Sequence, residues 1–538
     1  MAGHTVISFF RRMPRRASKS HTLLLPDSRE DALRRHFTAG RSPREPRDST
    51  VILLQSVEDP YYFGLFGLIV RSLRSRRAIR AEQFVMNSPR VGESRSIGWY
   101  LRARFINWLS LTKWSRLYCA YCDGVGYRGA DLRHPMGDAT DLWRAFVAWR
   151  GLTSRQMLIE MSIDGVPVGD LINDSYLRFK PAPTVDLEDI YLWLTIWNAR
   201  RQIRRAQSYF RRSLPVWYLT SYSTYIQHGI AVRVALQRGV RVHSFSNYQE
   251  FAKLLSLDDW VHTKNPDDYA NEFARLTDPE DRLAEAEAAL TARIAGALDT
   301  TSGYMRESAY TESTEPVPDV RGAVLVFLHD FFDSPHVYRD LVFADFWEWI
   351  CFTIETLRDA NIRFALKPHP NQISLNGPIF ERLRLHYPGL LIISPKITNT
   401  QLVDAGMACA VTVYGTVAHE MAFLGVPSIA CGHHPHISFD FCRTARSRDE
   451  YADLLRGFAS FDFDKGEMRR QSLMFFYMHN LNLDSERRNL RDAVADYRKA
   501  SADHATSGER LVRLLHAIEA LPAFQSYVSE LAEIGARQ

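Results

Sequence analysis

The chain has 538 residues, 46% of them hydrophobic and 24% charged, which excludes a disordered protein and is too long for one compact core. Its formal net charge is +5, but residues 1–48 carry eleven Lys and Arg against five Asp and Glu, so the remainder is nearly neutral. We therefore expect no nucleic-acid partner, because the folded part has no basic stripe.

The first segment, residues 1–48, is a basic tail that we expect to be flexible. Five cations between Arg11 and Lys19 follow a short apolar stretch, Val6 to Phe10, that cannot span a bilayer. The tail is either a disordered arm or a patch for anionic lipid head groups. Since no run of eighteen apolar residues occurs elsewhere, we expect a cytoplasmic protein that is peripheral to the inner membrane if the tail binds lipid.

In residues 49–265, short β-branched runs alternate with longer amphipathic stretches. This pattern is typical of a parallel sheet covered by helices, and we expect a Rossmann-like domain. A helix is expected from Tyr61 to Leu73. The expected strands are Val51–Leu54, Ala81–Met86, Val216–Thr220 and Val240–Phe245.

The next segment, residues 266–320, reads as a helical linker, because Asp278–Leu298 is rich in Ala, Glu and Arg and a polar stretch follows it. Residues 321–460 predict a second Rossmann-like domain, and residues 461–538 predict C-terminal helices. The predicted fold class is therefore α/β, with two doubly wound domains that face each other across a cleft. The strands expected in the second domain are Ala323–Leu328, Arg363–Leu366, Leu390–Ile393, Ala410–Val413 and Ser428–Ala430.

A first motif, Lys367-Pro368-His369-Pro370, directly follows an expected strand of the second domain. The two prolines forbid a helix, so His369 is held in an extended loop at the edge of the sheet where doubly wound folds bind ligands. A cation and an imidazole there suit a diphosphate. A lone H-P dipeptide is more often a simple turn, so the motif gains weight only beside a second one.

The second motif begins at Tyr414-Gly415-Thr416 and continues into a predicted helix that ends at Gly425. Gly415 would let a phosphate approach the backbone, and Thr416 would offer its hydroxyl beside the helix N–H groups, although a lone G-T is usually only an N-cap. Glu420 would accept hydrogen bonds from a ribose. His419 and Glu420 lie off the apolar stripe that should pack on the sheet, which consists of Val417, Met421 and Leu424.

In residues 321–445 the order K-P-H-P, then Y-G-T-x-x-H-E-x-x-x-x-G-V-P resembles the nucleotide-binding half of capsule polysaccharide biosynthesis glycosyltransferases. These belong to the GT-B superfamily, which includes Kdo and sialic-acid transferases with an H-P motif, and the chain is also similar to teichoic-acid glycerophosphotransferases. The resemblance implies that His369 contacts the donor phosphate, that Lys367, Pro370 and residues 414–420 form the donor site, and that catalysis needs no bound metal. Gly415 departs from the commoner Ser-Ser/Thr pair, so the nucleotide stays open among CMP, CDP, UDP and GDP.

The first domain supplies a candidate base in Gln227-His228-Gly229, which precedes an expected helix, Ala231 to Arg238. An imidazole at a helix start has its protonated form disfavoured, which suits a base. The segment is similar to the H-G element of glycerophosphotransferase-like enzymes. A histidine that caps or packs under the helix explains it equally well.

Other candidates for the acceptor side or the cleft are His329 and Asp330, which follow the first strand of the second domain, and Asp170, Asp174 and Arg178, which recur at four-residue spacing. An exposed salt-bridged helix face is the alternative for the last three. We expect no metal site: Cys119-x-x-Cys122 lacks a second pair, and Pro435 breaks the register of the cluster His433, His434 and His436, which reads as a donor-side loop.

These residues together favour a glycosyltransferase that moves a sugar from a nucleotide-activated donor to a glycan or glycolipid acceptor in capsular or surface polysaccharide synthesis, without a cofactor. On this hypothesis the acceptor binds to the domain of residues 49–265 and the donor to the domain of residues 321–460. Lys367 and His369 would neutralise the leaving group, and His228 would activate the acceptor hydroxyl. Two alternatives remain: transfer of a polyol phosphate such as glycerol phosphate from a CDP carrier, and a non-catalytic nucleotide-sugar-binding subunit of an assembly complex. The hypothesis requires His369 and the Gly415-Thr416 turn to meet in one solvent-accessible site.

Overall fold

The computed structural model describes residues 26–39, 49–86, 113–129, 135–300, 308, 310, 313–370 and 374–534. The cationic cluster at residues 11–19 lies outside this part of the chain. Residues 28–39, expected to belong to a flexible tail, instead form helix α3 (Ser28–Ala39). Leu33 and Phe37 of α3 are buried in the core of the first half, and Glu30 forms a buried ion pair with Lys113. The charge count hid this helix, because α3 carries three of the eleven Lys and Arg residues of this region as well as a buried apolar face.

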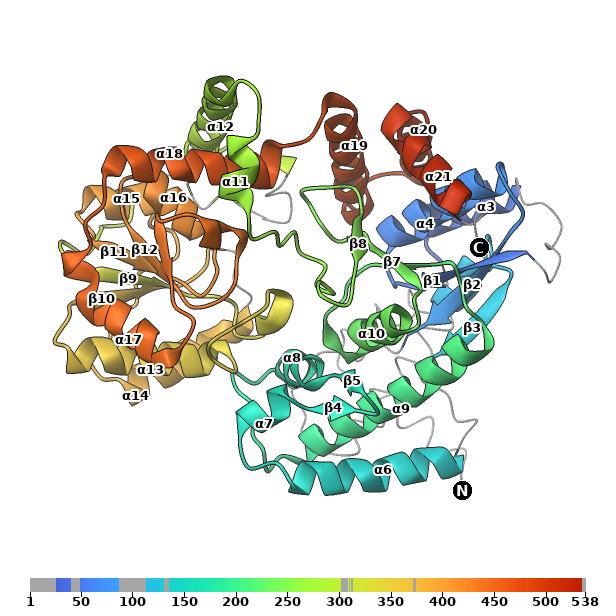
Figure 1. Ribbon diagram of the computed structural model, residues 1–538, viewed down its shortest axis with the longest axis horizontal. Coiled ribbons are helices and arrows are strands. Elements are labelled where there is room, and N and C mark those ends of the chain that lie inside the picture. The colour runs from blue at the N-terminus through green and yellow to red at the C-terminus, as the bar shows by residue number, and fades with distance from the viewer. Residues whose placement is uncertain are drawn as a thin grey trace.

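The first half is built on a six-stranded sheet in the order β3-β2-β1-β6-β7-β8, parallel except for β8 (Figure 1). Four of its strands were predicted. Two were missed, because β3 contains two glycines and β8 has three residues, so neither carries a strong strand pattern. The bounds are β1 Thr50–Gln55, β2 Ile79–Val85, β3 Gly124–Arg128, β6 Trp217–Thr220, β7 Arg241–Ser244 and β8 Lys253–Leu255.

Helix α4 (Pro60–Arg74) is largely buried in the core of this half. It begins where the Asp59 carboxylate accepts a hydrogen bond from the Tyr61 backbone N–H. Its Gly64 lets Tyr497 approach, since a Cβ there would collide with the Tyr497 hydroxyl. The other elements are α6 Pro135–Arg150, α7 Arg155–Ile159, the hairpin β4 Ser162–Ile163 and β5 Val166–Pro167, α8 Gly169–Phe179, α9 Ile190–Arg212, the π-helical turn η2 Tyr225–Gly229 and α10 Ile230–Gln237.

The second half is built on a five-stranded, fully parallel sheet in the order β10-β9-β11-β12-β13. The predicted strand at 390–393 is wrong: it makes one isolated bridge, from Ile392 to Leu366. Pro388 and Pro395 bracket that segment and leave it too short to continue the ladder. The fifth strand is β13 instead. The bounds are β9 Val324–Phe327, β10 Phe364–Lys367, β11 Cys409–Val411, β12 Ser428–Ala430 and β13 Cys442–Thr444.

The helices that precede and follow this sheet in the chain do not all pack on the second half. Helices α11 and α12 pack with α18 on the second half, and share a buried cluster with α16. In contrast, α19, α20 and α21 cross back and pack on α3 and α4, where Figure 1 shows them in red beside blue helices. The bounds are α11 Tyr269–Ala274, α12 Pro279–Ile294, α13 Phe346–Asp359, α14 Gly377–His386, α15 Asn399–Asp404, α16 Val417–Phe423, α17 Arg448–Gly457, α18 Lys465–Phe476, the π-helical turn η8 Tyr477–Leu481, α19 Ser485–Ala502, α20 Gly508–Glu519 and α21 Pro522–Ile534. Four 3₁₀ turns complete the described secondary structure: η4 Pro335–Val337, η5 Ser374–Asn376, η6 Pro435–Ser438 and η7 Phe458–Ser460.

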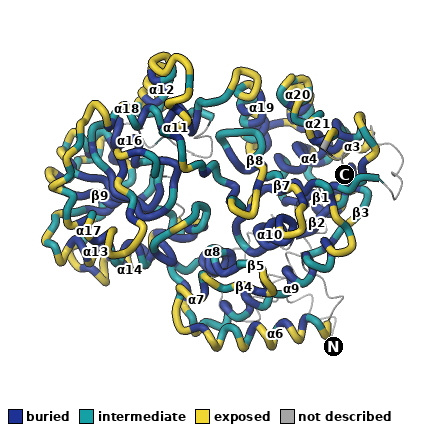
Figure 2. Tube along the Cα trace, in the orientation of Figure 1, coloured by how far each residue is buried: buried dark blue, intermediate teal, exposed yellow. Residues whose placement is uncertain are grey.

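Each sheet lies between layers of helices, and the buried segments concentrate at the sheets and their inner helix faces (Figure 2). The predicted fold class, two doubly wound α/β units with C-terminal helices, is confirmed by the strand orders. None of the described helices is both long and apolar enough to cross a membrane.

Candidate active site

A cavity of about 420 Å³ is lined by residues from both halves. On the second half its walls come from the segments that follow β9, β10 and β11, and on the first half from the segments that follow β6, β7 and β8. Apart from the antiparallel β8, these segments follow the carboxyl ends of parallel strands, where doubly wound sheets bind ligands. The volume is in the usual range for a small-molecule site. Both predicted motifs line this cavity, through Lys367, Pro368, His369, Pro370, Tyr414, Gly415, Thr416, His419 and Glu420.

Lys367, the last residue of β10, is 3% exposed, and its Nζ donates to the backbone oxygen of Pro395 at 3.2 Å. Burial lowers the pKa of Lys367 to about 8. Among the described residues no carboxylate lies within ion-pair distance of it. A buried ammonium without a counter-charge is costly, so this end of the cavity favours an anionic ligand.

The turn before α16 is built around Thr412, whose Oγ1 accepts the Gly415 backbone N–H at 3.2 Å and lies 3.1 Å from His329 Nε2. His329 is stacked on Phe346, with ring centroids 4.8 Å apart. A Cβ at position 415 would lie 2.7 Å from Thr412 Oγ1, so the close packing of this turn requires glycine. His329, one of the cleft candidates, therefore lines the cavity beside the second motif.

Helix α16 begins directly after its N-cap Thr416, which makes no side-chain capping bond. It stops just before Gly425, the predicted terminating glycine, whose φ is +83°. Glu420 faces the cavity and accepts a 2.7 Å hydrogen bond from the Tyr310 hydroxyl, which in turn accepts from Asn399 Nδ2. Burial raises the pKa of Glu420, although Arg293 acts against it. Tyr310 and Asn399 carried no sequence signal, because one lies in the irregular linker and the other in a helix start.

Six histidines line the cavity, and burial is the largest influence on each, lowering its pKa. The pKa falls to about 3 for His262 and His329, is lowered for His369, and falls well below the usual range for His419, His434 and His479. The rings are therefore neutral near pH 7. His434 belongs to the cluster that we interpreted as a donor-side loop, and it does reach the cavity.

The first half contributes Tyr222, Ser246 to Gln249, His262 and Lys264 to the wall. Sequence reasoning missed all of them, because they lie in loops whose proximity to the second half depends on the tertiary structure. Lys264 donates to the backbone oxygen of Met478 at 2.9 Å, so the turn after α18 closes the cavity from the second half.

His228, the predicted base, is buried with 7% of its surface exposed and does not itself line the cavity. It is separated from the cavity by Tyr222, to which its ring lies edge-on with ring centroids 5.7 Å apart. Its pKa is lowered to about 3, chiefly by burial and secondarily by His262. A lowered pKa is what we expected for His228. Its cause, however, is burial and not the start of a helix, since His228 lies in η2, which precedes α10.

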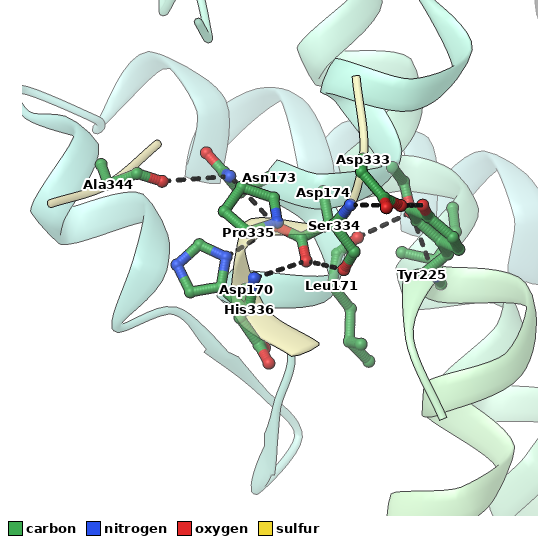
Figure 3. A network of polar contacts seen from close by, with 12 residues as sticks. Asp170, Leu171, Asn173, Asp174, Tyr225, Asp333, Ser334, Pro335, His336 and Ala344 are labelled. Atoms are coloured by element: carbon green, nitrogen blue, oxygen red, sulfur yellow. Dashed lines mark hydrogen bonds and ion pairs between the residues drawn. The ribbon is translucent and has the colours of Figure 1, made fainter. Parts of the chain in front are cut away.

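Asp170, Asp174, Arg178 and Asp330 do not line the cavity. Asp170 is ion-paired with Arg233 of the same half. Asp174 and Arg178 instead connect the halves. Asp174 accepts from Ser334 and from His336 Nδ1 (2.6 Å), as Figure 3 shows. Arg178 donates to the Phe332 backbone oxygen at 3.2 Å. Asp330 accepts the Phe332 backbone N–H at 3.0 Å and shapes the same loop.

No cluster of three or more His, Cys, Asp or Glu residues suited to a metal ion occurs in the part of the chain that the structure describes. His434 and His436 stack on each other at 4.3 Å and surround Phe475 together with His419 and His479. These rings form an aromatic cluster at the cavity wall.

No protein-family model and no curated protein matches the chain. Among solved structures it is similar to the KpsC beta Kdo 2,4 transferase of Thermosulfurimonas dismutans, with 13% identity over 49% of this chain and 79% of that one, and a TM-score of 0.31. It is also similar to a UDP-GlcNAc 2-epimerase of Methanocaldococcus jannaschii, with 10% identity over 87% of this chain and 99% of that one, and a TM-score of 0.22. A third similar structure is the wall teichoic acid polymerase TagF, with 10% identity over 91% of this chain and 95% of that one, and a TM-score of 0.21. Scores this low carry no argument about activity, so the assignment rests on strand order and on the cavity: the chain has a GT-B arrangement, two doubly wound parallel sheets with a site at their facing strand ends.

Proposed function

We propose that this protein is a glycosyltransferase that moves a sugar from a nucleotide-activated donor to a glycan or glycolipid acceptor in capsular or surface polysaccharide synthesis. The observation that carries the proposal is that Lys367, His369, Thr416 and Glu420 line one cavity, opposite a wall from the other half. Three groups that suit a diphosphate and one that suits a ribose lie together there, as a nucleotide sugar requires.

In this proposal the donor lies against the second half. Lys367 and His369 stabilise the charge that develops on the diphosphate as the glycosidic bond breaks, which is worth several kcal/mol in sites of this kind. His369 is neutral in the free protein, so it first acts as a hydrogen-bond donor. Glu420 accepts from the ribose in exchange for the Tyr310 hydroxyl. The proposal needs no metal ion, since the leaving-group charge falls on these side chains.

The acceptor then lies against the first half, on the wall formed by Tyr222, Asn247 and His262. His228, which lies behind Tyr222 and does not itself line the cavity, takes the proton of the attacking hydroxyl through one bridging water. Its low pKa keeps it unprotonated throughout the neutral range, which a general base requires.

Nucleotide binding is the first test. We expect one or more of CMP, CDP, UDP and GDP to raise the melting temperature of the protein, because a ligand at a hundred times its Kd stabilises the native state by about 2.7 kcal/mol. The His369→Ala variant should stay folded and lose transfer by about a hundredfold or more. The matched control is His386→Ala, an exposed histidine at the end of α14.

A fully active His369→Ala enzyme would overturn the proposal. Product analysis by mass and phosphorus content separates it from polyol-phosphate transfer: a product that gains a sugar without phosphorus supports a glycosyltransferase. Nucleotide binding without turnover on any acceptor would instead indicate a non-catalytic subunit.

A further inference from the structure

The side chain of Gln55, the last residue of the central strand β1, is fully buried behind the cavity wall. Its Oε1 accepts the backbone N–H of Ser221 at 3.2 Å. A backbone N–H can only donate, so this contact identifies the atom as the amide oxygen and excludes the flipped orientation, which would place two donors against each other. The hydroxyl of Ser221 lies at 3.1 Å and that of Thr220 at 2.8 Å from the same oxygen.

The same oxygen lies 3.2 Å from Nδ1 of His228. Because a carbonyl oxygen only accepts, Nδ1 must carry a proton. A neutral imidazole has one N–H, and burial keeps this ring neutral near pH 7, so its Nε2 holds an unshared lone pair. The hydrogen-bond direction therefore determines the tautomer of the ring.

The backbone holds His228 against Gln55. The ring lies in the π-helical turn η2, which begins at Tyr225 with a left-handed φ of +59°. A Cβ at Gly229 would lie 2.4 Å from the Ser223 backbone oxygen, so only glycine lets the turn close this tightly after the histidine. The turn therefore fixes the position of the His228 backbone next to Gln55.

We infer that Gln55 is a positioning residue that fixes His228 in the Nδ1–H tautomer and leaves Nε2 as the atom that accepts the proton of the acceptor hydroxyl. The role of Nε2 rests on the proposed function, whereas the tautomer does not. Gln55 acts only through His228, since it does not itself line the cavity.

Nuclear magnetic resonance of protein labelled with ring-¹⁵N histidine tests the tautomer directly. The His228 signals are assigned as those missing in His228→Asn. In the wild-type protein we expect a protonated Nδ1 and an unprotonated Nε2, and in Gln55→Leu we expect a mixture of both tautomers. The control Gln83→Leu removes an equally buried glutamine on the neighbouring strand β2, which bonds to Ser56 and Ser115, and should leave the His228 signals unchanged.

A wild-type Nε2–H tautomer, or a tautomer unchanged in Gln55→Leu, would overturn the inference. The Gln55→Glu variant keeps an acceptor oxygen at this place and serves if Gln55→Leu does not fold. Its added charge should raise the pKa of His228, for which the neighbouring titratable groups are Tyr222 and His262. The acid limb of the pH profile for turnover should then move to higher pH, and an unmoved limb would count against the inference.

Turnover separates this inference from the function. We expect Gln55→Leu to lower kcat about two- to tenfold with little change in donor KM, because only the fraction of His228 in the correct tautomer still acts while donor contacts stay. If the tautomer is as inferred but no glycosyl transfer occurs with any nucleotide sugar, the proposed function fails and the positioning by Gln55 stands. If transfer occurs and the tautomer is wrong, only the inference fails.

Discussion

Lys367 shows how one buried group can give a binding site its pH dependence. Its pKa is lowered to about 8 because burial opposes the ammonium and no carboxylate lies within ion-pair distance among the described residues. Below that pH it is charged and can bind an anion, and above it the charge is lost. A bound phosphate would raise the pKa again.

We therefore predict that the affinity for a nucleoside diphosphate, with CDP as the probe, falls as the pH rises from 7 to 9.5. Lys367→Met should weaken binding about ten- to a hundredfold at pH 7, because it removes one charge-assisted hydrogen bond. The same variant should abolish the pH dependence of binding. Titration calorimetry at several pH values measures both effects. The control is Lys396→Met, which changes an exposed lysine near Glu315. A wild-type affinity that stays constant between pH 7 and 9.5 would contradict the prediction.

At the scale of the element, the turn between β11 and α16 depends on the absence of a side chain at position 415. Thr412 Oγ1 occupies the space that a Cβ would take, and it receives the Gly415 backbone N–H. Any side chain at position 415 displaces this hydroxyl and changes the wall beside Thr416 and His329. The sequence suggested a phosphate approaching Gly415, and the structure adds that Thr412 packs there.

Gly415→Ala should lower nucleotide affinity about tenfold and reduce the free energy of unfolding by about 1–3 kcal/mol, the usual cost of overpacking. Gly377→Ala is the matched control, because Gly377 lies at the start of helix α14, as Gly415 lies just before α16, but has no atom within 4 Å of the added Cβ. Calorimetric binding and urea denaturation on both variants test this. Equal affinities in the two variants would show that the close packing at 415 has no bearing on the site.

At the scale of the whole molecule, helix α8 of the first half forms hydrogen bonds with the loop that follows β9 in the second half. Asp174 is 1% exposed and accepts from both Ser334 and His336, while Tyr225 donates to Asp333 at 3.3 Å (Figure 3). Asp333 lines the cavity, so this junction connects the placement of the halves to the site. Burial alone would lower the pKa of His336, but the Asp174 carboxylate outweighs it and the pKa is raised.

Asp174→Asn should therefore destabilise the protein by about 3 kcal/mol at low pH, because it leaves a buried His336 without its counter-charge. A histidine whose pKa is raised on folding stabilises fully below its unfolded pKa of 6.5, and that contribution is lost as the pH rises through the higher folded value. The stability difference from wild type should shrink with rising pH. Urea denaturation of both proteins between pH 5.5 and 8.5 measures this difference in stability, and Asp453→Asn, at an exposed carboxylate, is the control. A stability difference that grows with pH would refute the prediction.

Several parts of the fold could be predicted from local pattern. Strands such as β1 and β9 are runs of β-branched and aliphatic residues, and α16 carries its apolar stripe and its terminal Gly425 in the sequence. The K-P-H-P and Y-G-T segments follow strands, so their place at the sheet edge follows from the chain order alone. Strands β3 and β8 were missed because glycine content or brevity removes that local signal.

What the sequence determined by itself is the two doubly wound units and the two motifs on the second of them, since periodicity and turn chemistry act within a few residues. The tertiary structure decided which loops of the first half face those motifs, that α19 to α21 return to α4, and that His228 contacts Gln55 and not a ligand pocket directly. It also turned Asp174 and Arg178 from candidates for an acceptor face into contacts between the halves. These outcomes depend on packing between residues more than a hundred positions apart, which no local pattern encodes.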